Sequence, residues 1–252
     1  MKAIDPDRPI EVMGILNLTP DSFHAPSRYN MAMLDSGADI IDIGAYSTRP
    51  GHTPVSEEEE WHRLEPVLRL IAEQYSHLRI SIDTFRGSIV QKAYDIIGPF
   101  IVNDVTCGSE DPDLLPTTGC LGLPYIAMHH GPAEDSHEIA AFMDSFAAEA
   151  ESYGIRHWVA DPGFGFGKSL EQNFSILGTL DALVGKGDGL LVGISRKRMA
   201  YQPKGITAAE ALDATSSLHM EALQKGADIM RVHDVEAARE VIRAYRDYSE
   251  TR

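Results

Sequence analysis

Polar side chains able to accept hydrogen bonds recur along this chain at points where a short apolar run ends. They are carboxylates and amides: Asn17, Asp42, Asp83, Asn103 and Asp161. Carboxylate and amide oxygens suit a flat heterocycle that carries amino and ring N–H donors. Buried groups of this kind are costly without partners, so the set indicates a functional pocket rather than a series of strand caps.

Cationic side chains and hydroxyls form a second set. Lys197, Arg231 and His233 follow the last two apolar runs, while Thr48 and Arg49 lie in a loop after the second run. If the chain forms a β/α barrel, Lys197, Arg231 and His233 follow strands seven and eight, where barrels often bind phosphate. The two sets together indicate a ligand with a donor-rich ring at one end and a phosphorylated tail at the other.

Apolar, β-branched runs and amphipathic stretches alternate along the chain and must position these side chains. The predicted strands are residues 10–16, 39–44, 78–83, 99–104, 123–129, 157–162, 190–195 and 228–234. The predicted helices are residues 56–75, 85–97, 136–154, 170–183, 206–226 and 235–248. Continuous apolar runs are typical of parallel strands buried on both faces.

The repeated order of strand and helix permits either a closed barrel or an open, doubly wound sheet. Eight strands within 252 residues favour the barrel, and we predict a single α/β domain, a (β/α)8 TIM barrel over residues 1–252. In such a barrel the polar residues that end the strands share one mouth, where barrel enzymes place their chemistry.

Composition limits the class of protein. The formal net charge of −16 argues against nonspecific nucleic-acid binding and means that any anionic ligand needs local cations. Apolar runs do not reach the roughly 20 residues of a membrane span, so no membrane partner is expected. The two cysteines, Cys107 and Cys120, exclude a disulfide scaffold and favour a reducing cytoplasm.

A glycine-rich segment, DPGFGFGKS at residues 161–169, is similar to a phosphate-binding loop but fails that motif. A Walker A motif needs glycine five positions before Gly167, and Pro162 stands there. We expect these glycines to let the backbone pack closely beside a ring, with Phe166 as an apolar wall. Arg198 is interpreted either as a solvated surface residue or as a partner for a ligand carboxylate, and Asp42 as orienting Arg49 or capping a strand end.

Seven ordered motifs along nearly the whole chain resemble the dihydropteroate synthase family, the pterin-binding barrels of the folate pathway. They are MGILNLTPDSF (13–23), GADIIDIGAYSTRPG (37–51), SIDT (81–84), VND (102–104), DPGFGFGK (161–168), GISRK (193–197) and RVHD (231–234). The resemblance implies an alkyl/aryl transferase that condenses 6-hydroxymethyl-7,8-dihydropterin diphosphate with p-aminobenzoate. The products are 7,8-dihydropteroate and diphosphate.

The resemblance also assigns roles, residue by residue. Asp83, Asn103 and Asp161 would hydrogen bond to the pterin ring. Lys197 would contact the pterin from the side, Arg231 would stack on its face, and Met128 would flank it. Asn17 would contact diphosphate and Mg²⁺, and His233 would bind diphosphate, with Val232 counted in the same substrate-binding set. Thr48 and Arg49 would belong to a loop over the p-aminobenzoate site, which Phe166 would line. Lys197, Arg231 and His233 are the catalytic candidates, Mg²⁺ is the expected cofactor, and a homodimer is the expected assembly.

The chain departs from the family pattern in two places that bear on function. The loop after NLTPDSF reads HAPSRYN instead of a glycine-rich, acidic turn, and Arg198 stands where serine is usual. Two alternatives therefore stay open. One is a catalytically impaired pterin-binding homologue, and the other is a methyltetrahydrofolate-type methyltransferase barrel, which is expected to lack the STRPG, GISRK and RVHD motifs.

Overall fold

The computed structural model describes residues 7–18, 31–46 and 55–250. Eight strands hydrogen bond in the order β6-β5-β4-β3-β2-β1-β8-β7. Their bounds are β1 (Glu11–Asn17), β2 (Ile40–Gly44), β3 (Arg79–Asp83), β4 (Ile101–Asp104), β5 (Tyr125–Met128), β6 (Trp158–Asp161), β7 (Leu191–Val192) and β8 (Ile229–Val232). Each lies within or beside a predicted strand, because the apolar runs that predicted them are the buried segments of the sheet.

The two ends of this strand order are joined. Ala160 of β6 forms a parallel bridge with Leu190, and the Ala160 N–H donates to the Gly189 carbonyl at 3.0 Å. Strands β2 and β3, β3 and β4, and β7 and β8 also pair in parallel. A ring of eight strands in chain order is the topology of a (β/α)8 barrel, so the predicted fold class is confirmed.

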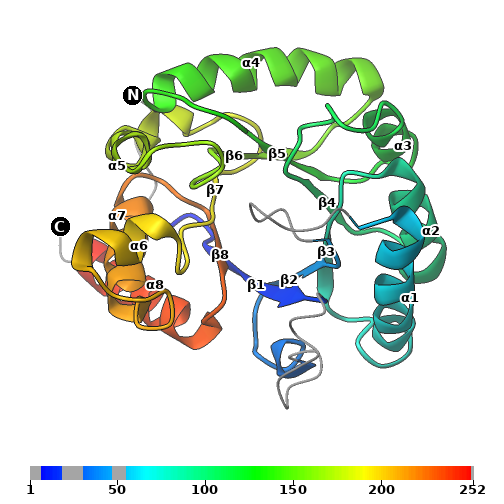
Figure 1. The fold of residues 1–252 in the computed structure, drawn as a ribbon, viewed down its shortest axis with the longest axis horizontal. Helices are drawn as coiled ribbons and strands as arrows, with labels where there is room; N and C mark the ends of the chain where they lie inside the picture. Colours follow the sequence, from blue (N-terminus) through cyan, green and yellow to red (C-terminus); the bar gives the residue numbers. More distant parts are fainter. Residues whose placement is uncertain (1–6, 19–30, 47–54, 251–252) are drawn as a thin grey trace. The chain divides into compact units, whose positions relative to one another are not determined.

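The helices follow the strands (Figure 1). Their bounds are α1 (Glu57–Gln74), α2 (Gly87–Ile97), α3 (Leu114–Cys120), α4 (Ser136–Tyr153), α5 (Leu170–Gly178), α6 (Arg198–Tyr201), α7 (Leu212–Gln224) and α8 (Val235–Glu250), with 3-10 turns η2 (Met31–Met33), η3 (Leu180–Leu183) and η4 (Gln202–Lys204). Sequence reasoning missed α3, whose seven residues include a proline and a glycine. A Cβ on that Gly119 would lie 1.8 Å from the Tyr153 carbonyl oxygen, so close packing explains the glycine.

Two compact units make up the chain. Unit 1 contains Met1–Met13, Ala127–Ala148 and Trp158–Arg252, and unit 2 contains Gly14–Ile126 and Glu149–His157. In unit 2, helices α1, α2 and α3 lie side by side outside β2, β3 and β4 (Figure 1). In unit 1, α7 packs on α8 beside β8. Each unit therefore carries its own set of strand ends.

Arg8 secures the amino-terminal side of unit 1. Its guanidinium donates to Asp228 at 3.0 Å, to the Tyr245 hydroxyl at 3.0 Å, and to the Leu223 and Ala227 carbonyls at 2.8 and 2.9 Å. Asp228 also accepts the Leu190 N–H at 2.9 Å. These bonds satisfy buried carbonyls at the end where β8 begins, which is the stability side of a barrel rather than its chemical side.

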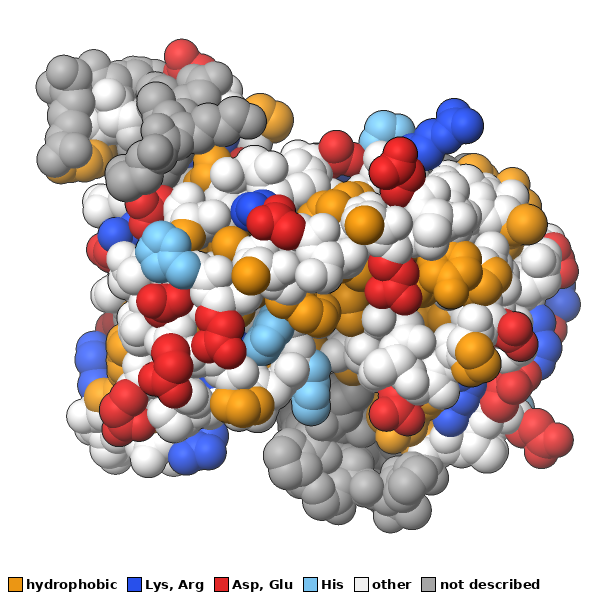
Figure 2. All heavy atoms as spheres, turned by 90° about the horizontal axis from the view of Figure 1, so that it is seen from above, with side chains coloured by type: hydrophobic (Ala, Val, Ile, Leu, Met, Phe, Trp, Pro, Cys, Tyr) orange, Lys and Arg blue, Asp and Glu red, His pale blue; other side chains and the backbone are white. Residues whose placement is uncertain are grey.

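The negative charge is spread over the surface. Figure 2 shows acidic side chains recurring singly across one face, with apolar side chains between them. Within the described residues, no helix is long and apolar enough to cross a membrane. A distributed negative charge repels anions at long range, so a phosphorylated ligand depends on cations built into its site.

Candidate active site

Unit 2 brings Asp83 and Asn103 into register at the ends of β3 and β4. Gly44 of β2 pairs with Asp83, and Asp83 pairs with Asn103, so the three residues share one row across the strands. A Cβ on Gly44 would lie 3.4 Å from the Asp83 Cβ, which means that the glycine leaves space for the Asp83 side chain. Asn17 ends β1, and the structure places it partly buried.

Asp42 holds the Asn103 side chain. The Asn103 amide Nδ2 donates to Asp42 Oδ1 and Oδ2 at 3.2 and 3.1 Å, and the Asp42 side chain is fully buried. This contact was not among the two roles considered for Asp42.

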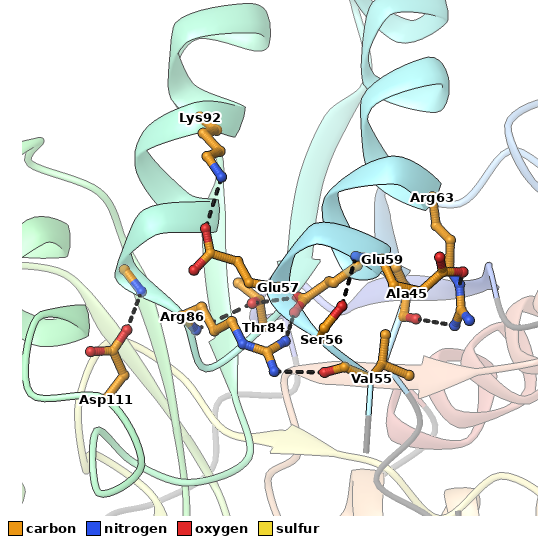
Figure 3. A network of polar contacts seen from close by, with 12 residues as sticks. Ala45, Val55, Ser56, Glu57, Glu59, Arg63, Thr84, Arg86, Lys92 and Asp111 are labelled. Atoms are coloured by element: carbon orange, nitrogen blue, oxygen red, sulfur yellow. Dashed lines mark hydrogen bonds and ion pairs between the residues drawn. The ribbon is translucent and has the colours of Figure 1, made fainter. Parts of the chain in front are cut away.

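A buried carboxylate on α1 ties down the segment after Asp83 (Figure 3). The Thr84 hydroxyl donates to Glu60 at 2.6 Å, and the Arg86 guanidinium pairs with the other Glu60 oxygen. Burial raises the pKa of the Glu60 carboxyl, while the Thr84 hydrogen bond acts in the opposite direction. The Thr84 N–H donates to the Asn103 carbonyl at 3.0 Å, so this network fixes the main chain beside both Asp83 and Asn103.

Two arginines bind the carbonyls on either side of residues 47–54. Arg63 donates to the Ala45 carbonyl at 2.9 Å and to Glu59 at 2.8 Å, and Arg86 donates to the Val55 carbonyl at 2.8 Å (Figure 3). The predicted site residues Thr48 and Arg49 lie outside the described residues. The Ser56 hydroxyl accepts the Glu59 N–H at 3.2 Å and so caps the start of α1.

Asp161 is the buried carboxylate of unit 1. It ends β6, and its Oδ1 accepts the Gly163 N–H at 2.8 Å. Burial raises the pKa of Asp161, while the charges of Lys197 and Arg231 and the Gly163 hydrogen bond lower it. Burial has the larger effect, so the pKa of Asp161 is raised overall, and the nearby cations offset part of that rise.

The glycine-rich loop after Asp161 is held by Lys168. The ammonium donates to the carbonyls of His129 and Gly163 at 3.0 Å each and to that of Phe166 at 3.3 Å. Burial lowers the pKa of Lys168 to about 8. Gly163 has φ +67°, and a Cβ there would lie 2.0 Å from the His129 carbonyl oxygen. Gly163 therefore packs closely against the main chain that follows β5, whereas the sequence predicted close packing beside a ring.

Lys197 lies over the Phe166 ring, a contact that the sequence did not predict. Its Nζ lies 2.5 Å from the Phe164 carbonyl oxygen and 4.5 Å from the centre of the Phe166 ring. A Cβ on Gly193 would lie 3.7 Å from that Nζ and 4.0 Å from the Arg231 Cβ. Gly193 therefore lies next to both cationic side chains, at ordinary contact distance.

The loops after β7 and β8 are locked together by Arg196, which sequence reasoning gave no role. Its guanidinium binds Asp234 through both oxygens at 2.7 and 2.8 Å and also donates to the Ala209 carbonyl at 2.7 Å. Arg196 has φ +54°, a strained value for a residue with a side chain. The pair raises the pKa of Arg196 and lowers that of Asp234.

The remaining predicted site residues of unit 1 are His233, Met128 and Val232. His233 lies at the surface, and its N–H and Nδ1 each lie 3.2 Å from the buried Ser195 hydroxyl. Met128 and Val232 are buried in the sheet. Arg198 is exposed at the start of α6, and its guanidinium donates to Gln202 at 3.2 Å, so the structure supports the surface interpretation of this residue.

Comparison with known proteins places the chain in a family. The model of the pterin-binding enzyme family matches residues 13–233. The dihydropteroate synthase of Bacillus subtilis is 34% identical over 239 residues, covering 89% of this chain and 83% of the relative. That of Escherichia coli K12 is 37% identical over 254 residues, covering 92% and 89%.

Solved structures agree. A Xanthomonas albilineans dihydropteroate synthase with 4-aminobenzoic acid superimposes with a TM-score of 0.87 at 35% identity, over 97% of this chain and 94% of that one. The Thermus thermophilus enzyme in complex with 6HMPPP gives 0.81 at 36% identity, over 96% and 95%. Sequence match, identity and fold together show that this chain belongs to the pterin-binding enzyme family, among the dihydropteroate synthases.

Proposed function

We propose that this chain condenses 6-hydroxymethyl-7,8-dihydropterin diphosphate with p-aminobenzoate, releasing diphosphate and forming 7,8-dihydropteroate. The observation that carries the assignment of roles is that the acceptors Asp83, Asn103 and Asp161 each end or nearly end a strand and are partly or fully buried. Oxygen acceptors in such positions suit the amino and ring N–H groups of a pterin. Met128 and Val232, both buried in unit 1, are proposed to add apolar contacts to the pterin.

The charges of unit 1 support the chemistry. Diphosphate departs from a carbon attached to an electron-rich ring, so positive charge develops on the ring and negative charge on the leaving group. The Asp161 carboxylate stabilises the first, and Lys197, Arg231 and His233 stabilise the second. The arylamine needs orientation more than a strong base, and Phe166 with Thr48 and Arg49 is proposed to supply it.

Mg²⁺ is part of this proposal. Within the described residues there is no group of three or more histidine, cysteine or acidic side chains that could hold a metal ion. Magnesium commonly binds one or two protein oxygens together with substrate phosphates and water, and the amide oxygen of Asn17 fits that role. When bound, the ion would neutralise diphosphate charge. Removing Mg²⁺ with a chelator is expected to weaken binding of the pterin diphosphate more than binding of the unphosphorylated pterin.

The direct test is a steady-state assay with both substrates that follows diphosphate release. Release that depends on p-aminobenzoate supports the proposal, whereas tight pterin binding without release identifies a catalytically impaired homologue. A single catalytic domain, a homodimer and a cytoplasmic location complete the proposal. Sedimentation of the purified protein tests the homodimer, and cell fractionation tests the location.

A further inference from the structure

The side-chain amide of Asn103 ends in a nitrogen that donates hydrogen bonds and an oxygen that accepts them. The nitrogen and oxygen of an amide are nearly equal in size, so hydrogen-bond partners decide which faces which way. Here the nitrogen lies 3.1 and 3.2 Å from the two oxygens of Asp42. A carboxylate accepts and does not donate, so the reversed amide would set its own oxygen against two negatively charged oxygens.

The consequence lies at the other end of the amide. The Asn103 oxygen Oδ1 accepts no hydrogen bond from the part of the chain that the structure describes, and Asn103 is only 4% exposed. Little of this residue is exposed, so the Oδ1 atom can accept a hydrogen bond from a ligand that reaches the small part that is.

We infer that Asp42 is a positioning residue that fixes the Asn103 amide so that its carbonyl oxygen, not its nitrogen, is presented to the pterin. The inference rests on the proposed function, because it assumes that a pterin binds beside Asn103. Asp42 is well placed for the task. It is fully buried on β2, in register with Ser81, two residues before the row formed by Gly44, Asp83 and Asn103.

A swap of the two residues tests the orientation directly. In Asn103→Asp two carboxylates face each other, and we expect binding of the pterin diphosphate, measured by calorimetry with Mg²⁺ present, to weaken at least about 100-fold. Adding Asp42→Asn restores a donor opposite the carboxylate and keeps an acceptor toward the ligand. The double variant is expected to recover at least about tenfold. If the swap binds no better than Asn103→Asp alone, the inference is overturned.

A second comparison remains decisive if Asn103→Asp does not fold. Asp42→Asn can donate as well as accept, so it frees the amide to reverse, and we expect about tenfold weaker pterin binding. In an Asn103→Ala background the same change should have no effect. An undiminished effect there would mean that Asp42 acts by another route, which contradicts the inference.

Ser81→Ala is the matched control. Ser81 lies in register with Asp42, and its buried hydroxyl has no hydrogen-bond partner among the described residues. Its removal should leave pterin binding unchanged, and a loss equal to that of Asp42→Asn would attribute both effects to general disturbance of the row and overturn the inference. Failure of the unmodified protein to bind pterin diphosphate would instead contradict the proposed function.

Discussion

The two units hold their strand-end residues by different means. In unit 2, carboxylates fix the ends of β3 and β4, because Asp42 binds Asn103 and Glu60 binds Thr84 and Arg86, and arginines hold only the carbonyls on either side of residues 47–54. In unit 1, cations do it, because Lys168 binds three main-chain carbonyls and Arg196 binds Asp234 and the Ala209 carbonyl. Under the proposed function, unit 2 would present acceptors to the pterin ring, while unit 1 would add positive charge for diphosphate around the Asp161 carboxylate.

Asp161→Asn is expected to give the largest effect and tests whether that single carboxylate is a binding group. We expect kcat/KM to fall at least about 100-fold, since a charged acceptor among cations is lost. The asparagine oxygen can still accept the Gly163 N–H, so the melting temperature should change little. Steady-state kinetics and thermal unfolding measure the two quantities. A collapse of folding would instead show that Asp161 is mainly structural.

Lys168→Met tests whether the cation that holds the glycine-rich loop of unit 1 affects substrate binding as well as stability. Arg8→Met is its matched control. Each change strips donors from buried carbonyls, and each is expected to cost about 3 kcal/mol in unfolding free energy. Lys168 holds the loop that carries Phe166, whereas Arg8 lies where strands begin. Only Lys168→Met should therefore also raise KM. Denaturant unfolding and kinetics check both, and equal effects on KM would break the distinction.

We expect unit 1 to lose stability at a higher pH than unit 2 as the solution is acidified. Burial lowers the pKa of His219 from its usual 6.5 to about 4, so the unfolded chain binds more protons between those values and stability falls as pH drops through them. At pH 5 this amounts to about 2 kcal/mol. The pKa of Glu60 in unit 2 is raised, so protonation of this carboxyl does not lower the stability of the folded state as the pH falls. Hydrogen exchange at pH 7 and pH 5 compares the units, and His219→Gln should flatten the acid response. An unchanged response in that variant would contradict this account.

Arg198→Ala should give the smallest effect. The side chain is exposed and bonded to Gln202, so we expect a change of less than about 0.5 kcal/mol in stability and less than about threefold in KM for p-aminobenzoate. A titration of p-aminobenzoate at saturating pterin diphosphate measures it. A tenfold rise in KM would restore the alternative in which Arg198 pairs with the substrate carboxylate.

Most of the fold was predictable because parallel strands buried on both faces have continuous apolar sequences. The sequence also located Asp83, Asn103, Asp161 and Lys197 near strand ends, since the run and its polar end are adjacent in the chain. Other features depend on contacts between distant residues. The Asp42–Asn103 pair spans 61 positions, and Arg196–Asp234 spans 38, so no local pattern reveals either.

The start of α7 shows a second limit. The helical pattern predicted a start at residue 206, and the helix begins at Leu212. Arg196 accounts for part of the difference, because its guanidinium binds the Ala208 and Ala209 carbonyls, which a continuous helix would use internally. A tertiary contact thus overrides local helical preference.

The Lys168 ammonium has a consequence for chemical labelling. The burial that lowers the pKa of Lys168 to about 8 also shields its amine, because the residue is only 7% exposed. Acylating reagents can reach it only when the glycine loop lifts from the carbonyl of His129. The rate of acylation at this lysine, divided by that of an exposed lysine, therefore reports how often the loop opens.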